Sequence, residues 1–165
     1  MHGGEPVGRV NLPLLGIFNV RNALGSIAAA VSAGATESDV LNALMRFGGV
    51  RRRLELRGVA QGVAVYDDFA HHPTAVRETL EGLRAAACAR RIWVVFEPRS
   101  ATACRKVFQS EFVEAMQLAD EVIIADVYRK GLPDRERLSE GELVSSLSQI
   151  GVSARHVSGV DSIVS

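Results

Sequence analysis

The sequence has few cysteines, few aromatic residues and no excess charge of either sign. Its 165 residues include two cysteines, Cys88 and Cys104, and only 5% Phe, Trp and Tyr. The cysteines form no CxxC pair and no disulfide framework, which fits a reducing compartment. Nineteen Lys and Arg balance nineteen Asp and Glu, so the formal net charge is zero. A general binder of nucleic acid or of anionic membranes would need a basic excess, so we expect neither kind of partner.

Long apolar runs are also missing. No run approaches the roughly 20 residues that a membrane-spanning helix needs, and the N-terminus lacks a signal-peptide pattern. With 47% hydrophobic and 23% charged residues, the composition is that of an ordinary globular protein and argues against disorder. We therefore expect a cytoplasmic protein built as one domain, or as a domain plus a fragment of another.

The first fifty residues predict a strand followed by two helices. The apolar residues Val7, Val10 and Leu12, with Gly8 and Pro13 nearby, favour a strand over 7–12. A helical apolar face then runs over 19–34, and a second helix begins with Thr36 or Ser38 as its N-cap. The glycine-containing stretch 48–51 is a candidate hinge between two structural units.

After this stretch, strand patterns alternate with helix patterns. A mainly parallel sheet flanked by helices, a Rossmann-like α/β unit, has this organisation. The continuous apolar run at 92–96 is typical of a strand covered on both faces. The expected elements are a strand pair at 54–57 and 62–66, a helix from Pro73, a strand at 92–96, a helix around 108–116, a strand at 122–125, a helix opened by the capping box Ser139–Glu142, and a strand at 152–157.

Polar clusters follow three of the expected strands, at 67–73, 97–100 and 126–130. Ligands gather at the carboxyl ends of strands in such sheets, so we expect the three clusters on one rim. Arginine forks bind phosphate and carboxylate, and aspartates can orient hydroxyls or magnesium-bound water. The pattern indicates a site that handles both kinds of anion.

Two other classes of function remain open at this point. A metal-dependent phosphoesterase would use Asp67, Asp68, His71 and His72 as ligands. Adjacent histidines on a turn point in different directions, however, and no second cluster has ligand spacing, so we expect no protein-built metal site. The other alternative is a non-catalytic α/β binding module.

Three segments resemble a known family. The sequences at 16–23 (GIFNVRNA), 47–55 (FGGVRRRLE) and 67–73 (DDFAHHP) closely resemble the Mur ligases, the ATP-dependent amino-acid and peptide ligases of bacterial peptidoglycan synthesis. The resemblance covers almost the whole chain, in the family's order and spacing. It implies a cytoplasmic ligase of cell-wall synthesis, and thereby a role in cell shape and division.

A fourth segment, 96–100 (FEPRS), is similar to the murein peptide ligase branch of this family. That branch attaches recycled L-alanyl-γ-D-glutamyl-meso-diaminopimelate to UDP-N-acetylmuramate. The branch that adds L-alanine to UDP-N-acetylmuramate typically has His-Arg-Tyr after the proline, where this chain has Arg99, Ser100 and Ala101. The tripeptide ligase is the first expectation, and the L-alanine ligase is the alternative.

The resemblance also implies nucleotide contacts. Asn19 and Asn22 would line the adenine side of the ATP site, and Arg53 and Asp68 would approach the ribose and phosphates. One departure affects this site: the family usually has His before the first asparagine, and Phe18 stands there. A phenyl ring can pack or stack but cannot donate a hydrogen bond.

Other residues would face the peptide substrate. The resemblance places His71, Arg99 and Ser100 there, and Arg99 suits a substrate carboxylate. His72 is expected instead to cap the helix that begins at Pro73. The family's common Ala-Gly-Glu is replaced by the sequence at 129–131.

No phosphate-binding GxxxxGK[ST] loop occurs in the sequence. The resemblance therefore implies that residues 1–50 are the C-terminal end of the central ATP-binding domain and residues 51–165 a C-terminal domain cut short at its end. ATP and Mg²⁺ would be bound mainly by the absent central domain, and no complete catalytic set is expected in this chain. We expect UDP-N-acetylmuramate and the murein tripeptide to be substrates of the full-length enzyme, and the isolated chain to be inactive.

Overall fold

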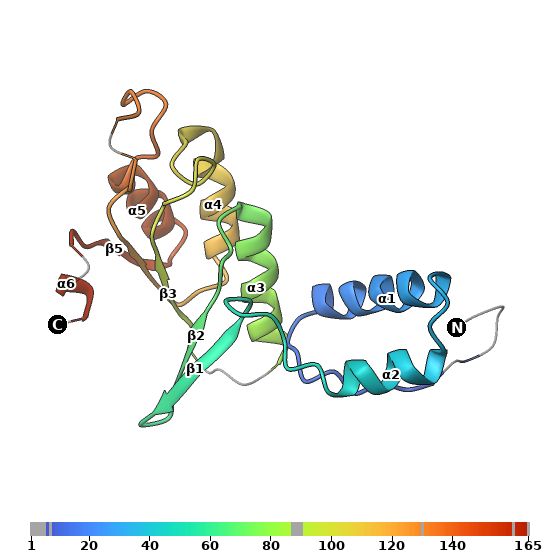
Figure 1. Cartoon of the computed structure of the whole chain (residues 1–165). Coiled ribbons are helices and arrows are strands. Elements are labelled where there is room, and N and C mark those ends of the chain that lie inside the picture. The colour runs from blue at the N-terminus through green and yellow to red at the C-terminus, as the bar shows by residue number, and fades with distance from the viewer. Residues whose placement is uncertain (1–5, 7, 87–90, 130, 160, 165) are drawn as a thin grey trace. The chain divides into compact units, whose positions relative to one another are not determined.

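The structure is a computed structural model that describes residues 6, 8–86, 91–129, 131–159 and 161–164 (Figure 1). The chain divides into two compact units, Met1–Phe69 and Ala70–Ser165. Cys88 and Lys130 lie outside the described residues. The sequence-based domain boundary after residue 50 stays a prediction.

The first unit contains the two expected helices, α1 (Ile17–Ser32) and α2 (Glu37–Met45). Gly16 precedes α1 with a φ of 88°, and the ring of Phe18 lies where a side chain at this position would have to go. Both observations call for glycine here. At α2, the hydroxyl of Thr36 accepts a 3.2 Å hydrogen bond from the N–H of Asp39, so Thr36 is the N-cap.

The strand expected over 7–12 is not observed. The described residues of that stretch and those up to 15 have no regular secondary structure. A strand needs a partner for its backbone hydrogen bonds, and the described part of the chain pairs no strand with this segment. Val10 and Leu12 instead line an apolar hollow of about 440 Å³ beside α1 and α2.

The same unit contains an antiparallel hairpin of β1 (Glu55–Ala60) and β2 (Val63–Asp67). Its turn, Gln61 and Gly62, has φ values of 51° and 80°. Two consecutive positive φ values give the backbone twist that suits a two-residue hairpin turn. This hairpin confirms the expected strand pair.

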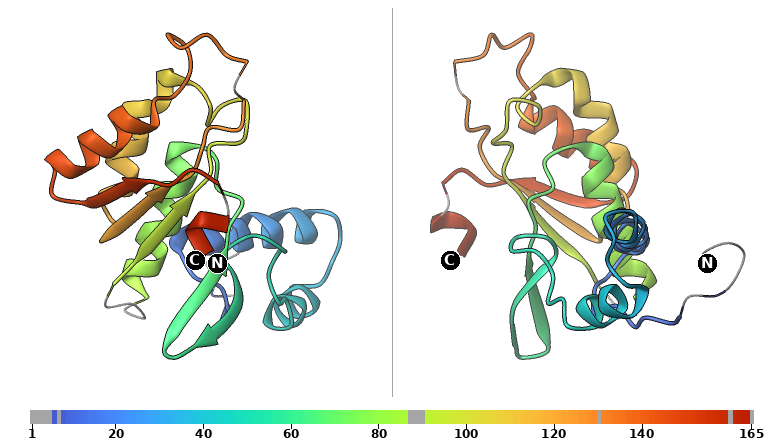
Figure 2. Two further views of the ribbon diagram at one scale, coloured as in Figure 1. Left: turned by 90° about the vertical axis from the view of Figure 1, so that its left-hand side faces the viewer. Right: turned by 45° about the vertical axis from the view of Figure 1, so that its right-hand side comes forward.

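The second unit is a parallel three-stranded sheet with helices stacked along one face (Figure 2). The strand order β3-β4-β5, with a helix between successive strands, confirms the Rossmann-like α/β organisation. The elements are α3 (Pro73–Ala85), β3 (Trp93–Phe96), the 3₁₀ helix η1 (Lys106–Phe108), α4 (Gln109–Met116), β4 (Glu121–Ile124), α5 (Glu140–Gln149), β5 (Ser153–His156) and α6 (Asp161–Val164).

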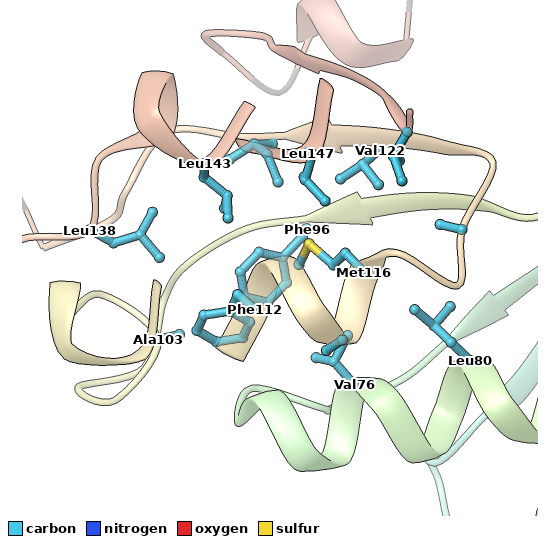
Figure 3. Close-up of a cluster of buried hydrophobic side chains, with 14 of the residues drawn as sticks. Val76, Leu80, Phe96, Ala103, Phe112, Met116, Val122, Leu138, Leu143 and Leu147 are labelled. Atoms are coloured by element: carbon cyan, nitrogen blue, oxygen red, sulfur yellow. The ribbon is translucent and has the colours of Figure 1, made fainter. Parts of the chain in front are cut away.

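The hydrophobic core lies between this sheet and α3, α4 and α5 (Figure 3). Phe112 of α4 is fully buried, and its ring centroid lies 4.9 Å from that of Phe96 on β3. The same cluster includes Val76, Leu80, Met116, Val122, Leu138, Leu143 and Leu147. This core fixes the carboxyl ends of the parallel strands, where the polar segments begin.

Within the described part of the second unit, the strand at 92–96 is covered on one face only, so the expectation of two covered faces is wrong there. Phe96 is buried and Val94 packs against the core, whereas Trp93 and Val95 are 51% and 58% exposed. Right-handed crossovers that all proceed in one direction place their helices on the same face of the sheet. The second face of β3 therefore has no such helix over it in the described part of the chain.

Both expected helix caps, His72 and Ser139, form, but the capping box at Ser139 is incomplete. Nδ1 of His72 accepts a hydrogen bond from the N–H of Thr74 at 3.4 Å, and the hydroxyl of Ser139 accepts one from the N–H of Glu142 at 3.3 Å. In a complete capping box, Glu142 would bind the N–H of Ser139 in return. Here that N–H donates to Oε1 of Gln109 at 3.0 Å.

Candidate functional sites

A tight turn in the first unit carries the arginine that was assigned to the nucleotide. Arg52 and Leu54 have positive φ values of 58° and 49°, which are rare for residues other than glycine. Two hydrogen bonds hold the turn in this shape. The N–H of Leu54 donates to Oδ2 of Asp68 at 2.6 Å, and the N–H of Phe69 donates to the carbonyl of Arg52 at 2.8 Å.

The side chains of Arg52 and Arg53 have different surroundings. Nε of Arg52 lies 3.4 Å from Oδ2 of Asp67, and its guanidinium lies over the ring of Phe69, 5.2 Å from the centroid. The exposed Arg53 side chain makes no hydrogen bond or ion pair with the described residues. Arg52 therefore serves the turn, and Arg53 is available for an anion.

Glu55 supports the turn from its other side. Its Oε2 accepts a 2.8 Å hydrogen bond from the N–H of Arg52, and its Oε1 lies 3.0 Å from Nη1 of Arg57. The backbone hydrogen bond, followed by the charge of Arg57, lowers the pKa of Glu55 from its ordinary value. The Glu55 carboxylate therefore stays charged to lower pH than an ordinary glutamate. In this charged form it accepts the hydrogen bond from the N–H of Arg52 that supports the turn.

The two asparagines assigned to adenine lie three positions apart on α1, and hence on one side of the helix. Nδ2 of Asn19 donates a 2.7 Å hydrogen bond to the carbonyl of Leu15, which fixes the segment before the helix. Asn22 is exposed, and its side-chain amide has no hydrogen bond within the described residues. Of the two, Asn22 has the more available amide.

The three polar clusters do not all follow strands of one sheet, which corrects the expectation from which a shared rim was inferred. The segment after β2 follows a two-stranded antiparallel sheet, and β2 pairs with β1 instead of joining the parallel sheet. The strand pair was expected, but the alternation of strands and helices did not show that it forms a sheet of its own. The segments after β3 and β4 do follow neighbouring parallel strands.

The segments at 97–100 and 126–129 form a rim at the carboxyl end of the parallel sheet, which we call the β3–β4 rim. The strands pair with Phe96 opposite Ile124. Pairing continues past them: the N–H of Ala125 donates to the carbonyl of Phe96 at 2.9 Å, and the N–H of Tyr128 donates to the carbonyl of Pro98 at 3.0 Å. These bonds fix the two segments of the rim to each other.

Arg99 is an exposed cation on the β3–β4 rim, and Arg129 is another. Its guanidinium lies over the ring of Tyr128, 4.6 Å from the centroid. Its Nη1 lies 3.7 Å from Oε2 of Glu97, a distance too long for a hydrogen bond. The side chain of Arg99 is 64% exposed, so its N–H groups can reach an anion from solvent.

Ser100, also assigned to the peptide substrate, shapes the segment that follows. Its hydroxyl accepts a hydrogen bond from the N–H of Ala103 at 2.9 Å, and its carbonyl accepts one from the N–H of Cys104 at 3.1 Å. The buried thiol of Cys104 in turn donates to the carbonyl of Pro98 at 3.1 Å. The backbone on both sides of Arg99 is therefore fixed.

A second polar group lies where β4 and β5 end. The hydroxyl of Ser158 donates to Oδ2 of Asp126 at 2.8 Å, and Nε2 of His156 lies 2.9 Å from Oδ1 of the same carboxylate. These two hydrogen bonds, that of Ser158 first, lower the pKa of Asp126 from its ordinary value. The contacts connect the segment after β5 to the end of β4.

Asp126, Glu140 and His156 are the described residues whose possible metal-ligand atoms lie within 4.8 Å of one another. Each has a partner within the protein: Oε1 of Glu140 accepts a 2.9 Å hydrogen bond from the N–H of Val127, and the other two residues bind each other. The phosphoesterase set Asp67, Asp68, His71 and His72 is not such a group in the described structure.

The adjacent histidines have separate positions. His72 caps α3, and its ring contacts that of Phe108 edge-on, with centroids 5.1 Å apart. His71 is exposed one residue before this cap. The capping role expected for His72 is confirmed, and the assignment of His71 to the peptide substrate stays a prediction.

Tyr128 is the site residue that the sequence analysis did not assign. The sequence places Tyr128 in a polar segment after a strand but does not show its contact with Arg99. The signal lay in the parallel register: Arg99 comes three residues after Phe96, Tyr128 comes four residues after Ile124, and Phe96 and Ile124 pair directly.

Comparison with known sequences shows the family. Residues 52–165 match the Mur ligase, glutamate ligase domain family. The chain is 38% identical over 161 residues, 97% of its length, to the UDP-N-acetylmuramate–L-alanine ligase of Desulfitobacterium hafniense, of which it covers 36%. It is 48% identical over 122 residues, 73% of its length, to the UDP-N-acetylmuramate–L-alanyl-γ-D-glutamyl-meso-2,6-diaminoheptandioate ligase of Escherichia coli, of which it covers 27%.

Solved structures support the same assignment. The crystal structure of the UDP-N-acetylmuramate–alanine ligase from Thermotoga maritima matches with a TM-score of 0.75 and 31% identity, over 94% of this chain and 33% of that one. The murein peptide ligase from Psychrobacter arcticus matches with a TM-score of 0.65 and 34% identity, over 94% of this chain and 32% of that one.

The chain spans about a third of the length of these relatives. Among the described residues, no helix is both long enough and apolar enough to cross a bilayer. The family match begins at residue 52 and includes the β1–β2 hairpin, the parallel sheet and the β3–β4 rim. The chain therefore belongs to the Mur ligase family, with residues 52–165 matching its glutamate ligase domain.

Proposed function

We propose that this chain is the acceptor-binding part of an ATP-dependent ligase that joins L-alanyl-γ-D-glutamyl-meso-diaminopimelate to UDP-N-acetylmuramate. The observation that carries the proposal is the exposed Arg99 on the β3–β4 rim, followed by the small residues Ser100 and Ala101. An arginine fork binds a carboxylate through two parallel hydrogen bonds. Each carboxylate of the acidic tripeptide is a possible partner for Arg99.

The small residues favour a peptide over a single amino acid. In the L-alanine-adding branch, Arg and Tyr typically stand where this chain has Ser100 and Ala101, and their long side chains would fill space at the rim. Ser100 directs its hydroxyl to the N–H of Ala103, and Ala101 is exposed. The rim then has room for a longer acceptor, and His71 is assigned to the same substrate.

On the nucleotide side, we assign Arg53 to the ATP phosphates and Asn22 and Asn19 to the adenine. The exposed guanidinium of Arg53 suits a phosphate, and Asp68 acts by fixing the turn that presents it. When bound, ATP supplies the phosphoryl group that activates a carboxylate for attack by an amine, and Mg²⁺ offsets its charge. The donor set for the phosphates and Mg²⁺ is incomplete here, because the sequence has no GxxxxGK[ST] loop.

We place this reaction in the cytoplasm, and we propose that the isolated chain has no ligase activity. The test of inactivity is phosphate release from ATP in the presence of UDP-N-acetylmuramate and tripeptide. Release at the background rate is expected, and release above it would contradict the proposal.

The L-alanine ligase is the second candidate, and two findings favour it. The match to the Desulfitobacterium relative extends over 97% of the chain, and the Thermotoga structure has the higher TM-score of the two described above. Overall similarity reports the shared fold more than the acceptor, because acceptor choice depends on a few residues at the rim.

A chimera distinguishes the two candidates. The part of the Escherichia coli tripeptide ligase that this chain matches is replaced by the chain, and the purified chimera is offered tripeptide or L-alanine with ATP and UDP-N-acetylmuramate. We expect addition of the tripeptide. Addition of L-alanine with the tripeptide unused would support the second candidate.

A further inference from the structure

We infer that Tyr128 is a positioning residue that holds the guanidinium of Arg99 by its face and leaves its N–H edge to the carboxylate of the acceptor. This inference rests on the proposed function, in which Arg99 binds that carboxylate. So far, only the segment after β3 has been assigned to binding of the acceptor carboxylate. The inference adds Tyr128, from the segment after β4. The 4.6 Å separation between the guanidinium carbon and the ring centroid carries it.

The two interactions of Arg99 do not compete, because they use different parts of the guanidinium. A cation–π contact uses the face of the planar group, whereas a carboxylate binds in the plane, along the N–H edge. Stacking restricts the rotation of a long and otherwise mobile side chain. A guanidinium held by Tyr128 has therefore lost part of its conformational freedom before the acceptor arrives.

Tyr128 can do this because its backbone is joined to the segment that carries Arg99. Its N–H donates to the carbonyl of Pro98 at 3.0 Å, and Pro98 is buried. Val127, one residue earlier, is buried, and its N–H donates to Oε1 of Glu140 at 2.9 Å. The ring of Tyr128 is itself 58% exposed, so it contributes little to the core.

Glu97 is the charged neighbour of the Arg99 guanidinium within the segment after β3. Its Oε2 lies 3.7 Å from Nη1 of Arg99, so it attracts the guanidinium without a hydrogen bond at this distance. Both side chains are well exposed, and exposed ion pairs of this kind are weak. An acceptor carboxylate can therefore replace Glu97 at the edge of Arg99 while the Tyr128 ring stays on the face.

The experiment uses the 165-residue chain and the tripeptide as probe. Binding is followed by NMR through the side-chain Nε–Hε resonance of Arg99, which senses the ring current of Tyr128. The variants are Tyr128→Leu, which removes the ring, and Tyr128→Phe, which keeps it. Trp93→Leu is the matched control, because Trp93 is also an exposed ring beneath a guanidinium, 5.2 Å from that of Arg91, but it lies on β3, before the rim.

We expect Tyr128→Leu to shift the Arg99 resonance in the free chain and to weaken tripeptide binding about three- to five-fold, the effect of an exposed cation–π contact. Tyr128→Phe should restore both the resonance and the affinity, and Trp93→Leu should change neither. If Tyr128 had only a structural role, Tyr128→Leu would not alter the Arg99 resonance. Recovery of both the resonance and the affinity in Tyr128→Phe would not be expected either.

Arg99→Ala separates the two ways in which the account can fail. If Arg99→Ala weakens binding and Tyr128→Leu does not, the inference about Tyr128 is wrong and the proposed function stands. If Arg99→Ala leaves binding unchanged, or if the wild-type chain shows no binding at millimolar tripeptide, the assigned role of Arg99 is wrong. In that case, an unchanged Arg99 resonance in Tyr128→Leu would also exclude the stacking itself.

Discussion

The backbone N–H of Leu54 donates a 2.6 Å hydrogen bond to Oδ2 of Asp68, fourteen residues further along the chain. This bond connects the turn that carries Arg53 to the end of β2. Asp68 was assigned to ATP from the resemblance to the family, and the structure gives its carboxylate a task within the protein. The two roles are compatible if Asp68 acts on the nucleotide through the position of Arg53.

Replacing Asp68 tests this link. Asp68→Ala removes the acceptor and leaves a partly buried N–H unpaired, so we expect a loss of about 1–2 kcal/mol in the free energy of unfolding. Asp68→Asn keeps an oxygen acceptor and should cost less. Thermal unfolding and hydrogen exchange of the Leu54 amide measure both effects. Unchanged exchange at Leu54 in Asp68→Ala would show that the bond does not hold the turn.

Arg52 and Arg53 are neighbours in the sequence, but their substitutions should have different effects. Replacing Arg52 should lower stability, and replacing Arg53 should impair function. Arg52→Ala removes the contacts with Asp67 and Phe69 and should lower the free energy of unfolding by roughly 1 kcal/mol. Arg53→Ala should leave stability within about 0.5 kcal/mol, as is usual at the surface. In the ligase chimera, Arg53→Ala should raise the KM for ATP. A larger loss of stability from Arg53→Ala than from Arg52→Ala would reverse these assignments.

Asp120 makes stability depend on pH in the acid range. Its Oδ2 accepts a 2.7 Å hydrogen bond from the N–H of Ile92 and lies 2.6 Å from Nη2 of Arg84. The backbone hydrogen bond first, and then Arg84, lower the pKa of Asp120 in the folded chain. A lowered pKa means that the stabilising contribution is present above the unfolded-state value, about 3.9, and is lost as the pH falls through the folded-state value.

We therefore expect Asp120→Asn to be less stable than wild type at neutral pH, by about 1 kcal/mol after allowance for solvent exposure. The difference should shrink as the pH falls below about 5. Urea unfolding at several pH values measures it. A difference that stays constant down to the acid limit would mean that the charge of Asp120 plays no part.

The sequence predicted which helices and strands form in the second unit. It predicted less well which strand faces are covered and which strands belong to one sheet. Helices α3 and α5 carry local signals, a proline at position 73 and a capping serine at position 139, and both helices are observed. The exposed face of Trp93 has no local signal, because it depends on the direction of the crossovers. The pairing of β1 with β2 was expected, but nothing in their residues showed that the pair forms a sheet of its own.

The same distinction applies to the candidate sites. Arg99 and Arg53 could be singled out from their motifs, and both are exposed. The role of Arg52 in holding its turn depends on Asp67 and Phe69, more than ten residues later, and spacing alone does not reveal it. Assignments of ATP and peptide contacts to single residues stay predictions.

The core should respond to the loss of a single large side chain. Phe112 is fully buried against Phe96, so Phe112→Ala should cost about 3–5 kcal/mol, the range for large-to-small changes in cores. Val107→Ala is the control, because Val107 is 68% exposed, and its effect should stay within about 0.5 kcal/mol. Chemical denaturation measures both. Equal effects would contradict the placement of the core.

The central claim is that the β3–β4 rim selects a peptide acceptor, and the most direct measurement is the ratio of kcat/KM for tripeptide to that for L-alanine in the chimera. The matched variant introduces the residues typical of the L-alanine branch, Arg99→His, Ser100→Arg and Ala101→Tyr. We predict that the chimera with the natural rim favours the tripeptide and that the triple substitution lowers the ratio at least ten-fold, a change of about 1.4 kcal/mol. A natural-rim chimera that adds L-alanine faster than tripeptide, with a ratio unmoved by the substitution, would contradict the account.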